Sequence, residues 1–230
     1  MAVPPARVAS DPRTPDRWAA ALALGFIVLL LGTEQVLVLP DVGDSASVVA
    51  TFYAAHRGLI IVLQVVGFLA AGLLAGYGWR LGPVDRGVAG AVLAAAVCAL
   101  APGLATLILA LVADPQHVAG AGTWNGLIPR GDDILFVGIV VLGAGVAWRL
   151  GRRLPALGVL ALVVAVACLV RLALEAAGRP RGALESVGPL SFLILVTVMA
   201  VLSFIGVLRR ASTAGTPGVA RRAEVGTPVP

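Results

Sequence analysis

The chain contains few charged residues, few aromatic residues and no lysine. Of its 230 residues, 13% are charged and 5% are aromatic, whereas 59% are hydrophobic. A soluble domain carries about 25% charged residues, so most of this chain must lie where a charged side chain is costly. The apolar residues are mainly Ala, Val, Leu and Gly, which suit helices packed closely in lipid. This composition excludes an ordinary soluble domain and indicates a membrane protein.

The basic residues do not indicate a nucleic-acid partner. All 17 are arginines, and they recur at the ends of apolar runs instead of forming one stripe. Basic flanks of membrane helices give the same high isoelectric point. We therefore predict the lipid bilayer as the main partner and no binding to nucleic acid.

Motifs for redox, metal or nucleotide chemistry are missing as well. Cys98 and Cys168 lie deep in apolar runs and form no CxxC pair, which argues against dithiol chemistry. No HExxH is present, and His56 and His117 lack partners at metal-binding spacing, so we predict no metal site. GxSxG and P-loop patterns are also absent. The sequence identifies no cofactor.

Six apolar runs reach or approach the roughly 20 residues that span the hydrocarbon layer. They cover residues 18–39, 59–79, 88–112, 134–148, 157–176 and 190–208. We therefore predict an all-α fold: a polytopic integral membrane bundle of six helices over residues 17–210. Segments 1–16 and 211–230 show no apolar period and are predicted to be disordered cytoplasmic tails.

The distribution of arginines predicts the orientation. With the N-terminus inside, the inner segments hold twelve arginines and the outer segments four, as expected when both ends are cytoplasmic. The inner set is Arg7, Arg13, Arg17, Arg80, Arg86, Arg149, Arg152, Arg153, Arg209, Arg210, Arg221 and Arg222, and the outer set is Arg57, Arg130, Arg179 and Arg181. We predict a multi-pass protein of the cell (plasma) membrane.

One phrase occurs twice. Trp-Arg-Leu-Gly stands at 79–82 and again at 148–151, at the ends of the second and fourth predicted helices. A helical hairpin used twice explains this, but a Trp-Arg pair is also a good anchor at the inner membrane face, and both explanations stay open. Glycines in these two helices are predicted at close helix contacts. They are Gly67, Gly72, Gly76, Gly138, Gly143 and Gly145.

Polar residues in the predicted helices lie mainly toward their outer ends. Ionisable groups inside a membrane are costly, so each is a candidate for function. We predict a polar pocket in the outer half of the bundle, with carboxylic acids whose burial keeps them protonated for acid catalysis. The predicted catalytic acids are Glu34, Asp132 and Asp133. The predicted substrate-binding residues are Gln64, Arg171, Glu175, His56, Trp124 and Asn125.

Each of these residues also has a purely structural interpretation. Asp132 and Asp133 could cap the fourth helix. Arg171 could pair with Glu175 one turn further on, or with Glu34 across the bundle. Glu34 itself could lie among the headgroups if the first helix ends early.

Two phrases carry a resemblance to a known family. Phe52-Tyr53-Ala54-Ala55-His56-Arg57-Gly58 leads into the second helix, and Leu154-Pro155 followed by Leu157-Gly158 starts the fifth. Together they resemble a domain-of-unknown-function family of small six-span bacterial membrane proteins. The resemblance covers roughly Arg17 to Arg210, and it implies the six-helix fold without supplying an activity.

A weaker architectural likeness is to small integral-membrane terpene cyclases, which are also compact and helical and use buried carboxylic acids on isoprenoids. No motif carries it, so no residue roles follow from it. Three functions stay open: an enzyme acting on a lipid-soluble, isoprenoid-like substrate; a small-molecule binding, sensing or transport protein; and a structural membrane subunit.

Overall fold

The computed structural model describes residues 16–34, 36–41, 43–178 and 184–213. These residues form α-helices, turns and short extended segments, with no strand among them. The helices are α1 (Arg17–Glu34), α2 (Ala46–Leu81), α3 (Arg86–Cys98), α4 (Leu100–Val112), α5 (Ala119–Asn125), α6 (Ile128–Leu150), α7 (Pro155–Ala176), α8 (Leu184–Phe204) and α9 (Val207–Thr213). The predicted all-α class is confirmed.

Five helical segments are long and apolar enough to cross a membrane. They are Ala46–Leu81, Arg86–Val112, Gly120–Leu150, Pro155–Ala176 and Ser186–Phe204. The first predicted helix is represented by a shorter apolar helix, Arg17–Thr33. Many large apolar side chains of these helices face outward, and Val159, Leu162 and Val166 on α7 are all at least half exposed. An apolar exterior on long apolar helices is that of a multi-pass membrane protein.

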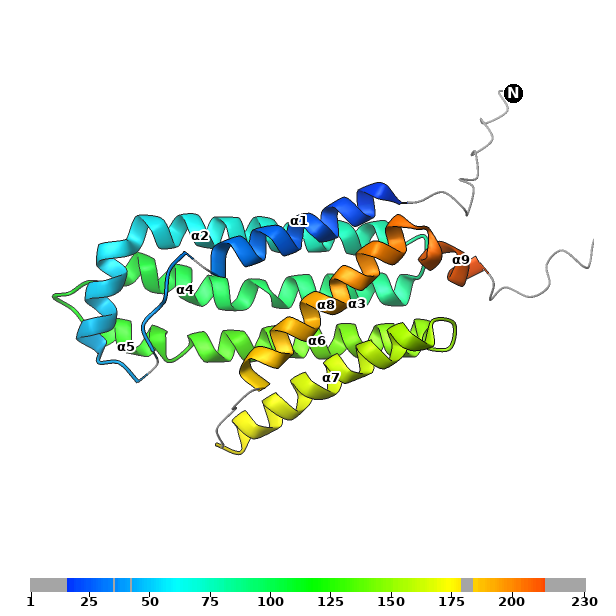
Figure 1. The fold of residues 1–230 in the computed structure, drawn as a ribbon. Helices are drawn as coiled ribbons and strands as arrows, with labels where there is room; N and C mark the ends of the chain where they lie inside the picture. The colour runs from blue at the N-terminus through cyan, green and yellow to red at the C-terminus, as the bar shows by residue number, and fades with distance from the viewer. Residues whose placement is uncertain (1–15, 35, 42, 179–183, 214–230) are drawn as a thin grey trace, which may run out of the picture.

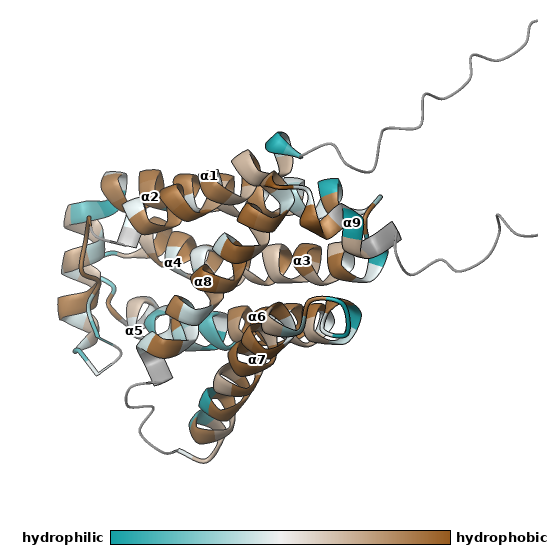
Figure 2. Cartoon of the chain, turned by 45° about the vertical axis from the view of Figure 1, so that its right-hand side comes forward, coloured by the Kyte–Doolittle hydropathy of each residue, from teal (hydrophilic) through white to brown (hydrophobic). Residues whose placement is uncertain are grey.

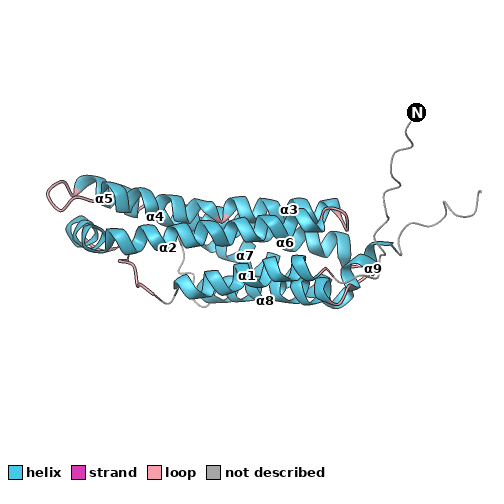
Figure 3. Cartoon of the chain, turned by 90° about the horizontal axis from the view of Figure 1, so that it is seen from above, coloured by secondary structure: helices cyan, strands magenta, loops and turns pink. Residues whose placement is uncertain are grey.

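The long helices close into a ring. α1 packs on α2, and α2 packs on both α3 and α4. α3 and α4 pack on α6, which packs on α7. α7 packs on α8, and α8 packs on α1 and so closes the ring (Figures 1 and 3). Buried residues from α1, α2, α3, α6, α7 and α8 form one continuous apolar core. A second, smaller core lies where α2 begins, beside α4 and α5.

The bundle has two different ends. The α2–α3 turn, the α6–α7 turn, the start of α1 and α9 lie together at one end, on the right in Figure 1. We call this the arginine end, because Arg80, Arg86, Arg149, Arg152 and Arg153 lie in or beside those turns. The start of α2 and α5 lie at the opposite end, the α5 end. Figure 2 shows hydrophilic residues concentrated at the ends and hydrophobic residues along the helices between them.

Several predicted helix boundaries are wrong. α1 ends at Glu34, well before residue 39, because Leu37 and Leu39 leave the helix to contact the bundle and Pro40 follows. α2 begins at Ala46 instead of residue 59. The hydroxyl of Ser45 accepts a hydrogen bond from the Val48 amide (3.4 Å) and caps it. Hydropathy identifies the apolar segments of the chain. It does not identify the more polar residues by which a helix such as α2 extends beyond its apolar segment.

The remaining differences concern the later helices. The third predicted run is two helices, α3 and α4, which meet at Ala99. The sixth run is α8 followed by α9, with Gly206 at φ 73° between them. The predicted disordered tails lie outside the described residues, except that Asp16 contacts α1 and α9 reaches Thr213.

The interpretation of the glycines is correct for α6 and wrong for part of α2. A Cβ at Gly138, Gly143 or Gly145 would lie under 3 Å from a neighbouring helix, whereas one at Gly67 or Gly72 would meet nothing within 4 Å. α6 is therefore the helix whose neighbours approach most closely through glycine.

Candidate functional site

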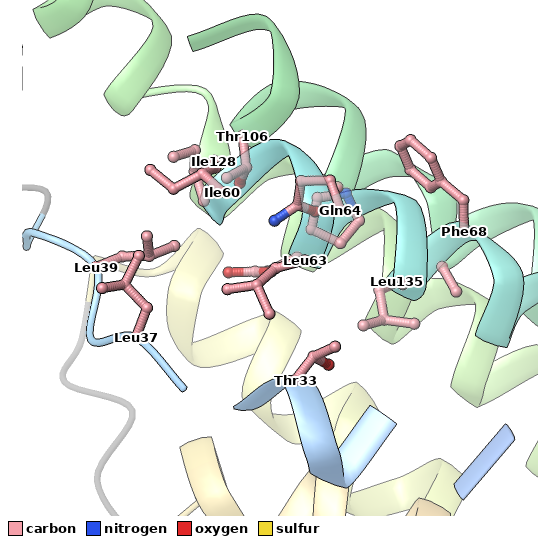
Figure 4. A pocket seen from close by; sticks show the side chains of 15 residues that line it. Thr33, Leu37, Leu39, Ile60, Leu63, Gln64, Phe68, Thr106, Ile128 and Leu135 are labelled. Carbon is pink, nitrogen blue, oxygen red and sulfur yellow. The ribbon is translucent and has the colours of Figure 1, made fainter. Parts of the chain in front are cut away.

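A cavity of about 310 Å³ lies between the end of α1 and helices α2, α4 and α6, toward the α5 end (Figure 4). Most of the residues that line it are apolar, including Leu63, Phe68 and Leu135. Four lining side chains are polar and come from four different segments: Thr33, Gln64, Thr106 and Asp132. Polar atoms and apolar side chains both line the cavity, which makes it a candidate small-molecule site.

The break between α3 and α4 shapes one wall of the cavity. Pro102 has no amide proton for the helix ladder, and Ala99, Pro102 and Gly103 all line the space. A Cβ at Gly103 would lie 2.8 Å from Cε1 of Phe68 and 3.0 Å from Oε1 of Gln64. Glycine at this position therefore lets these two α2 side chains lie directly against α4.

The two polar side chains of most chemical interest line the same cavity from different helices. Gln64 lies on α2 and Asp132 on α6, and both are half-buried. An amide offers a donor and an acceptor, and a carboxyl group accepts or, when protonated, also donates. Thr106 on α4 is buried, and the hydroxyl of Thr33 donates to the Leu30 carbonyl (2.8 Å). These groups can orient one polar head within the cavity.

Asp133 does not share this cavity. Its carboxylate accepts a hydrogen bond from Nη1 of Arg171 at 2.8 Å, and it is 29% exposed, whereas the Arg171 side chain is 2% exposed. The Arg171 guanidinium also lies 3.7 Å from the centroid of the Phe136 ring, a cation–π geometry. The ion pair joins α6 to α7. Arg171 was expected to pair with Glu175 or Glu34, and Asp133 is a partner that the sequence did not single out.

The capping interpretation of the two aspartates is wrong. α6 begins at Ile128, and its N-cap residue Leu127 makes no side-chain capping bond. Asp132 and Asp133 therefore lie in the second turn of α6. Consecutive residues on a helix point about 100° apart, which is why one aspartate reaches the cavity and the other reaches α7.

His56, Trp124 and Asn125 form contacts at the α5 end, away from the cavity. The Nδ1 of His56 lies 2.9 Å from the Phe52 carbonyl, and its ring packs on the Phe52 ring at 4.4 Å. Asn125 is buried and donates to the Asp41 carbonyl (3.1 Å). Trp124 packs against the smaller core. Their contacts stabilise the α5 end, and none of the three lines the cavity.

The structure thus brings two of the nine predicted site residues to the cavity, Gln64 and Asp132. Glu34 is the last residue of α1, and its side chain lies outside the described part of the chain. Glu175 is half-buried in the last turn of α7 and does not line the cavity. Sequence reasoning missed the wall formed by Pro102 and Gly103, although a Pro-Gly pair inside an apolar run is a signal for a broken helix.

The arginine end contains two ion pairs with the same arrangement, in which an arginine at the end of one helix binds an aspartate at the start of another. Arg80 donates to Asp16 (3.0 Å) and Arg149 to Asp85 (3.1 Å), and each pair joins residues 64 positions apart. Each aspartate also accepts backbone N–H bonds at a helix start, from Ala19 in one case and from Gly87 and Val88 in the other. The Arg-Leu-Gly of each repeated phrase therefore closes a similar two-helix unit, which supports the hairpin repeat.

Asp85 is held in its charged form. Burial opposes its ionisation, but hydrogen bonds from Arg149 and from the backbone amides outweigh burial and lower the pKa of the Asp85 carboxyl. At the α5 end, the hydrogen bond to His117 (2.8 Å) and that from the Gln116 amide lower the pKa of Asp114.

Within the described ranges, no three His, Cys, Asp or Glu side chains lie close enough together to hold a metal ion. Cys98 and Cys168 are free thiols.

Neither a protein-family model nor a curated protein nor a solved structure matches the chain. The resemblances to the six-span bacterial family and to membrane terpene cyclases therefore stay predictions.

Proposed function

We propose that this multi-pass membrane protein binds a small amphipathic molecule in the cavity between α1, α2, α4 and α6. The observation that carries the proposal is the placement of Gln64 and Asp132 in one cavity that is also lined by apolar side chains. The apolar part of the ligand would contact Leu63, Phe68 and Leu135. Its head would be a hydrogen-bond donor or a cation, because a carboxylate and an amide oxygen both accept hydrogen bonds.

An enzyme acting on a lipid-soluble, isoprenoid-like substrate is the second candidate, and Asp132 is the acid that favours it. Acid catalysis by two neighbouring carboxyl groups sharing a proton has no support, because Asp133 faces Arg171 at 2.8 Å and lies outside the cavity lining. A single acid in an apolar cavity can still protonate a substrate. Binding requires fewer assumptions, so we place it first.

We also propose that α1 is a sixth crossing and that both ends of the chain lie in the cytoplasm of a cell with the protein in its plasma membrane. α1 has 18 residues, about 27 Å of helix, close to the roughly 30 Å of the hydrocarbon layer. Its start lies at the arginine end together with α9 (Figure 1). Arginine-rich ends of membrane bundles face the cytoplasm.

Photolabelling tests the binding proposal. A long-chain alkylamine carrying a diazirine is the probe, and alkanol and alkanoate diazirines of the same length are its comparisons. We expect the amine to label peptides of α2, α4 and α6 that line the cavity. Asp132→Asn should reduce that labelling about tenfold, which corresponds to the loss of one charge-assisted hydrogen bond. Gln64→Leu should give a smaller reduction.

Asp114→Asn is the matched control, because it removes the same charge from a residue that does not line the cavity. Its labelling should equal that of the unaltered chain. Equal labelling by all three probes, or labelling unchanged in Asp132→Asn, would show that the cavity does not bind such molecules. Cyclisation of an isoprenoid diphosphate by the purified protein, lost in Asp132→Asn, would favour the enzyme instead.

A further inference from the structure

A second cleft lies at the opposite end of the bundle from the cavity. It has a volume of about 310 Å³ and is lined by Asp85, Trp148, Arg149, Arg152 and Arg153. Three guanidinium groups and one carboxylate give this cleft a net positive charge. The Trp148 side chain is 84% exposed, and an exposed indole at the end of a membrane helix lies at the depth of the lipid headgroups.

The repeated phrase shows that two of these arginines are not needed to end a helix. In the first copy, Trp79-Arg80-Leu81-Gly82 is followed by Pro83 and Val84. In the second copy, Trp148-Arg149-Leu150-Gly151 is followed by Arg152 and Arg153. Both copies close their unit with an Arg–Asp pair. The additional arginines therefore change the charge of the cleft and not the architecture of the turn.

The turn that carries Arg152 and Arg153 is tightly held. The amides of Arg153 and Leu154 both donate to the Leu150 carbonyl, at 2.9 and 2.8 Å. Leu150 and Leu157 on either side are buried. Gly151 and Gly158 are in close contact, so α6 and α7 approach each other at this turn. The backbone thus presents two arginines at a fixed position beside Trp148.

Arg149 is oriented toward the cleft by Asp85. The contact uses Nε of Arg149, which lies 3.1 and 3.2 Å from the two carboxylate oxygens. Its terminal η nitrogens make no hydrogen bond to any residue within the described segments. Guanidinium N–H groups bind phosphate oxygens through charge-assisted hydrogen bonds, and the η nitrogens of Arg149 remain available for such bonds.

From this arrangement we infer that the cleft binds the phosphate headgroup of an anionic phospholipid. Arg149 and Arg152 would donate to the phosphate, Arg153 would add positive charge, and the acyl chains would extend along the apolar surface of α6 and α7. A basic pocket between membrane helices at the headgroup level is suited to such a lipid. The site is separate from the cavity near Asp132 and does not depend on its function.

Fluorescence quenching by brominated lipids tests the inference. Trp148 is left as the sole tryptophan by Trp18→Phe, Trp79→Phe and Trp124→Phe, and the chain is placed in phosphatidylcholine vesicles. Brominated phosphatidylglycerol should quench Trp148 at about thirtyfold lower mole fraction than brominated phosphatidylcholine, because about two arginines contribute. Arg152→Gln with Arg153→Gln should bring the two lipids to equal quenching.

The matched control removes the same two charges at the same end of the bundle, through Arg17→Gln and Arg86→Gln, which lie outside this cleft. It should retain the preference for phosphatidylglycerol.

Native mass spectrometry of the chain with all four tryptophans gives a second readout, in which the variant with Arg152→Gln and Arg153→Gln should retain fewer phosphatidylglycerol molecules. The site would be overturned if both lipids quenched Trp148 equally in the single-tryptophan chain. It would also be overturned if the control variant lost the preference for phosphatidylglycerol as fully as the variant with Arg152→Gln and Arg153→Gln. Displacement by inorganic phosphate at constant ionic strength would assign it to the free ion instead.

Discussion

At the scale of single residues, Arg171 is the most unusual feature of the molecule. It is 1% exposed, on a helix whose outer surface is apolar. A buried charge requires a partner, because its desolvation penalty is large. Asp133 supplies the opposite charge and Phe136 a ring face. Arginine is suited to such a position because its delocalised charge combines hydrogen bonding with stacking. We interpret the pair as an α6–α7 connection inside the membrane.

Removal of either partner should destabilise the protein, but unequally. Asp133→Asn leaves the fully buried guanidinium without its carboxylate and should cost about 3 kcal/mol. Arg171→Met leaves Asp133, which is 29% exposed and can be hydrated, so its cost should be about half as large. Unfolding by SDS titration in mixed micelles measures both. A larger loss for Arg171→Met would contradict this account of the pair.

At the scale of elements, α6 has the largest share of close contacts. It packs on α3, α4 and α7. A Cβ at Gly143 would lie 2.6 Å from the Ala161 carbonyl oxygen of α7, and one at Gly138 would lie 2.6 Å from Cβ of Cys98 on α3. Small residues let membrane helices approach closely, and van der Waals packing then stabilises them. α6 is thus the helix that packs most closely against its ring neighbours through glycine.

A single methyl group on the crowded face should be sufficient to disturb this packing. Gly143→Ala should lower the free energy of unfolding by about 2 kcal/mol, because the obstructing atom is backbone and cannot rotate away. Gly72→Ala on α2 is the matched control, since a Cβ there meets nothing within 4 Å. It should be neutral or slightly stabilising, because alanine favours helix. Thermal denaturation in detergent compares the two, and equal melting temperatures would refute the packing argument.

At the scale of the whole molecule, the closed ring and the shared position of its two described ends favour the even number of crossings that we propose. α1 contacts both α2 and α8 and so completes the ring. A helix that lay on the membrane surface would not run alongside two spanning helices. The five long segments and the shorter α1 together account for the ring.

Cysteine accessibility tests this topology. In a chain with Cys98→Ala and Cys168→Ala, a membrane-impermeant maleimide should label Asp114→Cys in intact cells if, as we propose, the α5 end faces outward. Arg17→Cys and Arg152→Cys should be labelled only after the membrane is opened. Labelling of Arg17→Cys in intact cells together with Asp114→Cys would mean that α1 does not cross. Labelling of both Arg17→Cys and Arg152→Cys in intact cells, without labelling of Asp114→Cys, would mean that the orientation is reversed.

The sequence by itself determined the class of the protein and the approximate position of its helices. Apolar composition and run length reflect the cost of placing charge in lipid, and this cost depends on the residues alone. The position of α7 was predicted almost to the residue, since Pro155 starts it and the residues from Ala156 to Val170 are all apolar. Start and end points elsewhere were wrong where helix continues outside the membrane, as in α2, or where an apolar segment leaves the helix, as after Glu34.

Only the tertiary structure decided which polar residues meet. Asp132 and Asp133 are adjacent in the sequence, yet one lines the cavity with Gln64 and the other binds Arg171 on α7. Hydropathy does not distinguish these directions, because lipid-facing and protein-facing sides of a membrane helix are both apolar. The rotation of each helix is instead set by close packing at positions such as Gly103 and Gly143, and that packing exists only when the helices are together.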